Sequence, residues 1–300
     1  MNHGGHGVSR RSGNPPRTSV SSVVENLDRL YAKYNRREFV HPDPLEFLYR
    51  YDRLEDREIV GLIAAGLAYG RVASILNSVG AVLERMGPGP AGFIDDSSIR
   101  GSMRGFQHRW TTAEEVEALL EGIKRVRAAH GSIGACVQAH YRGDTLQSLA
   151  SLVSLLTGGE QNSLLPDPSK PSACKRLHLY MRWMVRKDEV DPGGWDFIPR
   201  SALLVPLDVH MHRMARRFKF TKRKQANLAT VLEVTAAFRQ LCPDDPVKYD
   251  FALTRPGIWG SDAFPRIGLP RRSSQRCPAS SRCRGTTPRQ SSLRAKTGSF

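Results

Sequence analysis

The chain has 300 residues, 40% of them apolar, and a formal net charge of +16. This length suffices for one sizeable core or two lobes. A membrane protein is not expected, because no apolar run approaches the roughly eighteen residues of a membrane span. The first residues, MNHGGHGVSRRSG, lack the apolar core of a secretory signal. The five cysteines are odd in number and scattered. They favour a reduced cytoplasmic setting over a disulfide framework.

The positive charge is unevenly distributed along the chain. Residues 1–18 carry +3 and residues 261–300 carry +8, which leaves +5 for residues 19–260. Both ends are rich in Gly, Pro, Ser or Arg and lack helical periodicity. We therefore expect disordered basic segments at 1–18 and 261–300 around one helical domain at 19–260. The last segment is also compatible with a nucleic-acid-binding arm or with a reading-frame error. Its Cys277 and Cys283 lack the additional partners of a metal site.

Helical periodicity predicts most of the first half of the domain. We expect helices at 20–34, from Pro44 toward Tyr51, and at 56–69, where Gly70 would end the helix. The next helix carries Leu76, Val79, Val82 and Leu83 and is broken at 88–90. Thr112 and Glu115 have the spacing of a capping box, which predicts a helix over 113–130.

The second half of the domain continues the same pattern. We expect helices at 133–141, at 145–156, from Ser172 as N-cap, from Asp208, at 229–241, and from Asp245-Pro246 with proline at the first helical position. Strand-like alternation is absent. The sequence therefore predicts an all-α fold.

The segment SACKRLHLYMRWMVRK contains a lysine at a position typical of the first turn of a helix. Leu177, Met181, Met184 and Val185 form an apolar stripe, and Lys175 lies off it. The partial positive charge of a helix N-terminus disfavours an ammonium, which suits an amine that acts in its neutral form. Asp208 follows 33 residues later, in VPLDVHMHRMARR, at the expected start of the next helix. An amine and a carboxylate in these places suit nucleophilic attack with proton removal. A solvated lysine and a capping aspartate are the simpler alternative.

The VPLDVHMHRMARR segment resembles the catalytic-aspartate segment of the helix-hairpin-helix (HhH-GPD) DNA glycosylases, nearest to the 8-oxoguanine glycosylases. The region from about Leu30 to Trp259 also resembles an uncharacterised bacterial family, on the segments LEDREIVGLIAAGLAYGR, SACKRLHLYMRWMVRK, GGWDFIPRSALLVPLDVH and CPDDPVKYDFALTRPG. The glycosylase resemblance implies a two-lobed helical fold with a central cleft. It implies that Lys175 is the nucleophile and Asp208 its catalytic partner, without metal or organic cofactor. The implied activity is base-excision DNA repair by a glycosylase/AP lyase.

The resemblance also implies a partner and a location. The partner is double-stranded, damaged DNA with an extruded base, such as an oxidised purine. We expect a monomer in the bacterial cytosol. One departure is evident: these glycosylases carry a Leu-Pro-Gly-x-Gly turn before the lysine helix, where this chain reads LLPDPSKPSACK without glycine. Either other groups hold the phosphate, or DNA is bound differently.

Cations are concentrated after Asp208. They could bind DNA phosphates in a salt-dependent way or form a solvated basic face, and the neighbouring Lys175 and Asp208 favour DNA. We call the seven cations between residues 213 and 224 the basic segment: Arg213, Arg216, Arg217, Lys219, Lys222, Arg223 and Lys224. His210 and His212 point in different directions on a helix, so joint metal binding is not expected. His210 is instead a candidate structural or DNA-facing residue near the Asp208 carboxylate. His178 and Arg182, on the Lys175 side of their helix, are candidates to line a cleft. Trp183 and Trp195 are candidates for base stacking or for the core.

Two alternatives remain open. The chain could be a non-catalytic nucleic-acid-binding protein of the same fold, which the missing glycine turn favours. It could also act on free nucleosides or another sugar-linked substrate with the same lysine chemistry. The identity of the lesion does not follow from these residues.

Overall fold

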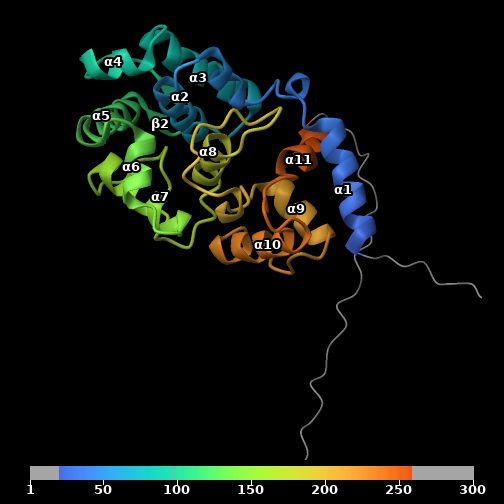
Figure 1. The fold of residues 1–300 in the computed structure, drawn as a ribbon. Coiled ribbons are helices and arrows are strands. Elements are labelled where there is room, and N and C mark those ends of the chain that lie inside the picture. The colour runs from blue at the N-terminus through green and yellow to red at the C-terminus, as the bar shows by residue number, and fades with distance from the viewer. Residues whose placement is uncertain (1–19, 97, 259–300) are drawn as a thin grey trace, which may run out of the picture. The chain divides into compact units, whose positions relative to one another are not determined.

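A computed structural model describes residues 20–96 and 98–258, and these residues form a predominantly helical structure (Figure 1). The expected disordered segments at 1–18 and 261–300, with Cys277 and Cys283, lie outside the described residues. The α-helices are α1 (Val20–Tyr34), α2 (Leu54–Gly66), α3 (Val72–Met86), α4 (Pro90–Asp96), α5 (Ala113–His130), α6 (Ile133–His140), α7 (Thr145–Thr157), α8 (Lys175–Val185), α9 (Val209–Arg217), α10 (Leu228–Leu241) and α11 (Asp250–Ile258). The shorter elements are η1 (Arg37–Phe39), η2 (Pro44–Arg50), η3 (Arg200–Ala202), β1 (Gln107–His108) and β2 (Thr111–Thr112).

The all-α prediction is confirmed for the described residues apart from one small hairpin of β1 and β2. The expected helices at 20–34, 113–130, 133–141, 145–156 and 229–241 correspond to α1, α5, α6, α7 and α10 within one or two residues. The capping box at the start of α5 is present: Thr112 accepts from the Glu115 amide, and Glu115 accepts from the Thr112 amide. Local sequence signals were sufficient for these helices.

The predicted end of α2 was wrong by three residues. The helix ends at Gly66 rather than at Tyr69, although Gly70 does adopt a left-handed φ of +99°. Tyr69 is held outside the helix by tertiary contacts, because its carbonyl oxygen lies 3.0 Å from His108 Nε2 and its hydroxyl donates to the His108 carbonyl oxygen. Contacts with a segment about forty residues away therefore override the local pattern.

The expected helix from Asp245-Pro246 was also wrong, because α11 begins at Asp250. Asp245 does not cap a helix; its buried carboxylate accepts from the Arg186 guanidinium. The short helix α4 and the β1–β2 hairpin were not predicted. In the hairpin, Gln107 pairs with Thr112 and His108 with Thr111. Such short elements carry too few residues for a periodic signal.

Helix α2 lies at the centre of the packing, and its residues from Glu58 to Gly66 are all buried. It packs against η2, α4 and α8, while α5, α6 and α7 pack against one another. The N-terminal helix α1 packs against the C-terminal helix α11, which also contacts α9 (Figure 1). Helix α8 connects the two groups, because Tyr180 donates to the Glu58 carbonyl oxygen on α2 and Arg182 donates to Asp250 on α11. In the part of the chain that the structure describes, no helix is both long and apolar enough to cross a membrane.

Candidate lysine–aspartate site

The structure brings Lys175 and Asp208 together at the N-termini of α8 and α9. Lys175 Nζ lies 4.0 Å from Asp208 Oδ2, and the side chains are 33% and 26% exposed. The amine is also 3.5 Å from the carbonyl oxygen of Ala68, just beyond the end of α2. We call these two side chains the lysine–aspartate pair. Its members are close enough to exchange a proton through a small movement, and both side chains are partly open to solvent.

Asp208 is positioned by the start of its helix. Its Oδ1 accepts from the Met211 amide at 2.7 Å, as an N-cap residue does, and this leaves Oδ2 toward Lys175. The preceding Val205-Pro206-Leu207 segment is buried and non-helical, and Thr235 Oγ1 accepts from the Val205 amide. The structure thus confirms the prediction that a non-helical Val205-Pro206-Leu207 segment leads to a helix capped by Asp208.

Ser172 is not the N-cap of α8, so that prediction was wrong. The helix begins at Lys175, after Cys174 in a left-handed conformation (φ 42°). Ser172 Oγ instead accepts from the Cys174 amide at 3.3 Å, and Ser172 forms a β-bridge with Asn227. The serine therefore closes a turn against the segment before α10. The predicted apolar stripe of Leu177, Met181, Met184 and Val185 is buried, as expected.

Arg182 does not line a cleft, contrary to the sequence-based expectation. It is 3% exposed; its Nε donates to Asp191 Oδ1 at 3.1 Å, and its Nη1 donates to Asp250. A guanidinium with two buried carboxylate partners is a structural tie between α8 and α11. Burial, the largest cause, and the nearby charge of Asp208 raise the pKa of Asp250 to about 6, against a lowering by Arg182. The buried acid is thus electrostatically linked to the lysine–aspartate pair.

Arg186, one turn further along the chain, extends the same set of contacts. Its guanidinium donates to Asp191, to Asp245 Oδ2 at 3.0 Å and to Asp188 Oδ2 at 2.9 Å. We call the set of Arg182, Arg186, Asp188, Asp191, Asp245 and Asp250 the arginine network. The arginine network was not predicted from the sequence. The available signal was a pair of arginines at i and i+4 in a helix with many apolar residues, since buried guanidinium groups need carboxylate partners.

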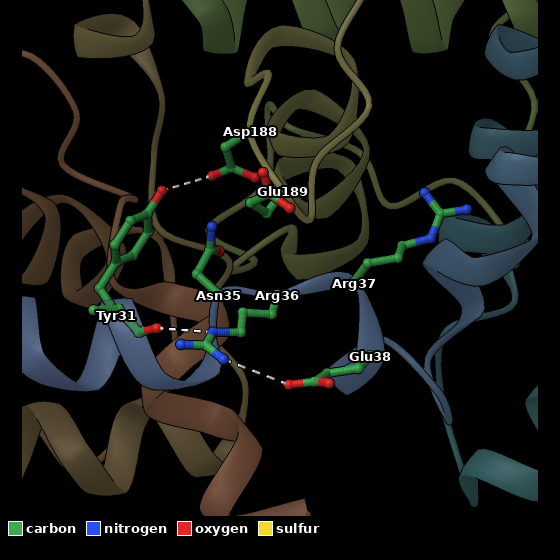
Figure 2. Close-up of a pocket in the computed structure, with 8 residues that line it drawn as sticks. Tyr31, Asn35, Arg36, Arg37, Glu38, Asp188 and Glu189 are labelled. Atoms are coloured by element: carbon green, nitrogen blue, oxygen red, sulfur yellow. Dashed lines mark hydrogen bonds and ion pairs between the residues drawn. The ribbon is translucent and has the colours of Figure 1, made fainter.

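The outer edge of the arginine network borders a shallow hollow of about 600 Å³ between the end of α1 and residues 188–189 (Figure 2). Tyr31 Oη donates to Asp188 Oδ2 at 3.0 Å, and burial raises the pKa of this tyrosine to about 12. Figure 2 shows Arg36 turned to Glu38 and Arg37 pointing away from Asp188. Arg36 is thus paired with Glu38, and Asp188 with Tyr31 and Arg186. The hollow does not include the lysine–aspartate pair.

His178 and the two tryptophans are core residues rather than cleft residues, which corrects another expectation. His178 is 2% exposed, and burial lowers its pKa to about 4, so the ring is neutral near pH 7. Trp183 and Trp195 are fully buried. Trp195 Nε1 donates to Glu58 Oε1 at 2.8 Å. Gly134 packs so closely here that a Cβ would lie 2.3 Å from that oxygen. Neither indole can stack on a base in this structure.

The basic segment is exposed, as expected for a phosphate-binding surface. A shallow hollow of about 460 Å³ is bordered by Val209, His212, Arg213, Arg216, Arg217 and Lys224. Arg223 forms an ion pair with Glu233, so it is less available than its neighbours. His210 Nδ1 lies 3.3 Å from Arg213 Nη2, whereas His212 Nε2 lies 3.0 Å from the Arg223 carbonyl oxygen. The two histidines therefore have separate surroundings.

The stretch that follows the basic segment pairs with the loop that precedes Lys175. The Ser172–Asn227 bridge and the hydrogen bond from the Leu228 amide to the Pro171 carbonyl oxygen join the two stretches. The loop itself is closed by Asp167, whose Oδ1 accepts from the amide and hydroxyl of Ser169. The loop without glycine is thus held by residues that follow the basic segment in the chain.

These observations define an all-α protein that presents an accessible amine and carboxylate at two neighbouring helix N-termini. Over residues 43–259 the chain matches the family described as protein of unknown function (DUF2400), and it belongs to that family. This agrees with the expected relation to an uncharacterised family. Comparisons with curated proteins and with solved structures gave no match.

Proposed function

We propose that the protein is a DNA glycosylase/AP lyase that acts on a damaged, extruded base, such as an oxidised purine. The observation that carries the proposal is the approach of Lys175 Nζ to within 4.0 Å of Asp208 Oδ2, with both side chains partly exposed. A buried pair would be structural, and a fully exposed pair would be held too loosely for directed attack. This geometry suits an amine nucleophile with an adjacent proton acceptor.

The proposed reaction begins with attack of the neutral Lys175 amine on C1′ of the deoxyribose. The C1′–N bond to the base breaks, the base leaves with the bonding electrons, and Asp208 transfers the proton lost by Nζ toward the departing base. The nitrogen lone pair then opens the sugar: the C1′–O4′ bond breaks, O4′ takes a proton, and an iminium joins Nζ to C1′. Loss of a C2′ proton expels the 3′-phosphate by β-elimination. Neither a metal nor an organic cofactor takes part in this scheme.

The surroundings of the lysine–aspartate pair support DNA as the substrate. The basic segment begins in the helix that Asp208 caps, and the residues that follow it, Asn227 and Leu228, pair with the loop before Lys175. Lys222 and Lys224, both exposed, could bind the phosphates that a glycine turn holds in the resembling glycosylases. Two helical lobes with a cleft at α8 and α9 are part of this proposal. The proposal also includes a monomeric state and action in the bacterial cytosol.

Borohydride trapping tests the proposal. Duplexes that contain an abasic site or 8-oxoguanine are incubated with the protein and sodium borohydride, which reduces an iminium to a stable amine. We expect a covalent adduct with the natural protein and none with Lys175→Ala. Lys170→Ala is the matched control, because Lys170 is an exposed lysine in the same loop region that pairs with Asp167. An adduct that survives Lys175→Ala, or no adduct on either duplex, would overturn the proposed reaction.

A second candidate is a non-catalytic nucleic-acid-binding protein of the same fold. The loop without glycine before Lys175 favours it, since a conventional phosphate-binding turn is missing. Under this alternative, affinity for DNA would be unchanged by Lys175→Ala and Asp208→Asn. It would fall with Arg216→Ala/Lys224→Ala, and the dependence on salt would become shallower by about 0.9 per lost phosphate contact.

A further inference from the structure

Trp110 is the large aromatic residue that the described structure leaves most exposed, with 58% of its surface accessible. It lies at the turn of the β1–β2 hairpin, next to the exposed Arg109. Its ring is stacked on Tyr69, with 4.6 Å between centroids and 16° between planes. The Arg109 guanidinium lies over the indole ring, 4.9 Å from its centroid. A planar, exposed aromatic beside a cation is the arrangement that binds unstacked nucleobases.

The hairpin that carries Trp110 is firmly anchored. The buried His108 contacts Ser78 Oγ through Nδ1 at 2.8 Å and the Tyr69 carbonyl oxygen through Nε2 at 3.0 Å. The Tyr69 hydroxyl lies 2.6 Å from Thr111 Oγ1, which in turn lies 2.5 Å from Ser163 Oγ. Because these contacts immobilise the hairpin, the indole is presented with little loss of conformational freedom on binding.

The backbone at the hairpin turn is strained. Arg109 has a φ of 55°, in the left-handed region that is unfavourable for a residue with a side chain. The turn holds this conformation although glycine would adopt it at lower cost. Strained residues of this kind concentrate at functional sites, where the surrounding structure holds them in place.

The Trp110–Tyr69 stack lies next to the lysine–aspartate pair. Lys175 Nζ contacts the carbonyl oxygen of Ala68, the residue before Tyr69. Arg176, the residue after Lys175, donates to the Gly66 and Ser163 carbonyl oxygens, and its guanidinium lies 5.2 Å from the Tyr69 ring. The start of α8, the end of α2 and the hairpin are therefore joined by direct contacts.

We propose that Trp110 is a positioning residue that stacks on a DNA base adjacent to the nucleotide at Lys175. The indole occupies the gap in the base stack and holds the duplex open. Arg109 contributes positive charge beside that base. The inference rests on the proposed function for the identity of the neighbouring nucleotide, but stacking itself needs no reaction at Lys175.

The test uses a duplex with a tetrahydrofuran abasic analogue, which has no aldehyde and forms no Schiff base. Fluorescence anisotropy of labelled DNA gives the affinity, and tryptophan emission reports stacking on the indole. We expect Trp110→Ala to weaken binding to this duplex by about 5- to 150-fold. The preference of the protein for the analogue over an intact duplex should be lost. Trp110→Phe should retain affinity within threefold but lose the quenching of emission on DNA binding.

Leu155→Ala is the control for removal of an exposed apolar side chain, since Leu155 is 40% exposed on α7. It should leave affinity unchanged, and all variants should unfold at the same temperature as the natural protein. Unchanged affinity and quenching in Trp110→Ala would overturn the inference even if borohydride trapping succeeds. Conversely, loss of both would uphold the stacking role even if trapping fails. A protein that binds neither duplex overturns both proposals.

Discussion

The two ends of helix α8 use cation–carboxylate contacts in opposite ways. At its start, Lys175 meets one carboxylate at 4.0 Å, and both groups remain partly exposed. Toward its end, Arg182 and Arg186 share four carboxylates inside the protein. A buried guanidinium with such partners already uses its N–H donors and cannot bind a ligand. The partly exposed lysine amine can. The difference separates a site that can react from one that holds α8 in place.

The first prediction concerns the start of α8, where Lys175 meets Asp208. Asp208→Asn should slow adduct formation with an abasic duplex by about 10²- to 10⁴-fold, because the proton acceptor is lost. Stability should be preserved, since asparagine caps a helix about as well as aspartate. Single-turnover trapping gives the rate, and urea unfolding gives the stability. The exposed Asp196→Asn is the control. A rate within twofold of the natural protein would remove Asp208 from the mechanism.

The second prediction concerns the arginine network at the end of α8. Arg186→Ala should lower the free energy of unfolding by about 3–5 kcal/mol, because it leaves Asp188, Asp191 and Asp245 without their shared cation. Adding Asp245→Asn to this variant should restore part of the loss by removing one unpaired charge. Urea unfolding at pH 7 measures both changes. Arg239→Ala, on the surface of α10, should change stability by less than about 0.5 kcal/mol. Equal effects of the two arginine substitutions would contradict the structural role.

The third prediction concerns His178, which lies between the two ends of α8. Its pKa is about 4 in the folded protein, below the ordinary value of 6.5, so the unfolded chain binds a proton more readily between these pH values. The stabilising effect of the neutral ring is therefore present above pH 6.5 and is lost as the pH falls toward 4. The expected loss is about 3 kcal/mol.

The His178→Phe variant isolates this effect, since phenylalanine suits the buried position and does not titrate. Unfolding free energies are measured between pH 7 and pH 4 for both proteins. Between pH 7 and pH 4, the free energy of unfolding should fall by about 3 kcal/mol more for the natural protein than for the variant. The other titrating groups, Asp250 included, contribute to both curves. Parallel curves would show that the imidazole is protonated in the folded protein or that it is accessible to water.

Local sequence signals were enough for α1, α5, α6, α7 and α10 and for the approach to Asp208. The capping box of α5 and the Asp208 cap depend on residues three positions apart, so they are readable without tertiary information. The apolar stripe of α8 likewise predicted its buried face. The start of α8 was not readable, because Ser172 is diverted into a bridge with Asn227, a residue far along the chain.

The sequence by itself determined an all-α fold, an amine and a carboxylate at helix N-termini, and an exposed basic segment. Only the tertiary structure decided that Lys175 and Asp208 meet, that Arg182, His178 and Trp195 are buried, and that Trp110 is exposed and stacks on Tyr69. The physical reason is that helical periodicity and capping arise within a few residues. Burial and partner choice depend on contacts between residues that the chain separates widely, such as Arg182 with Asp250.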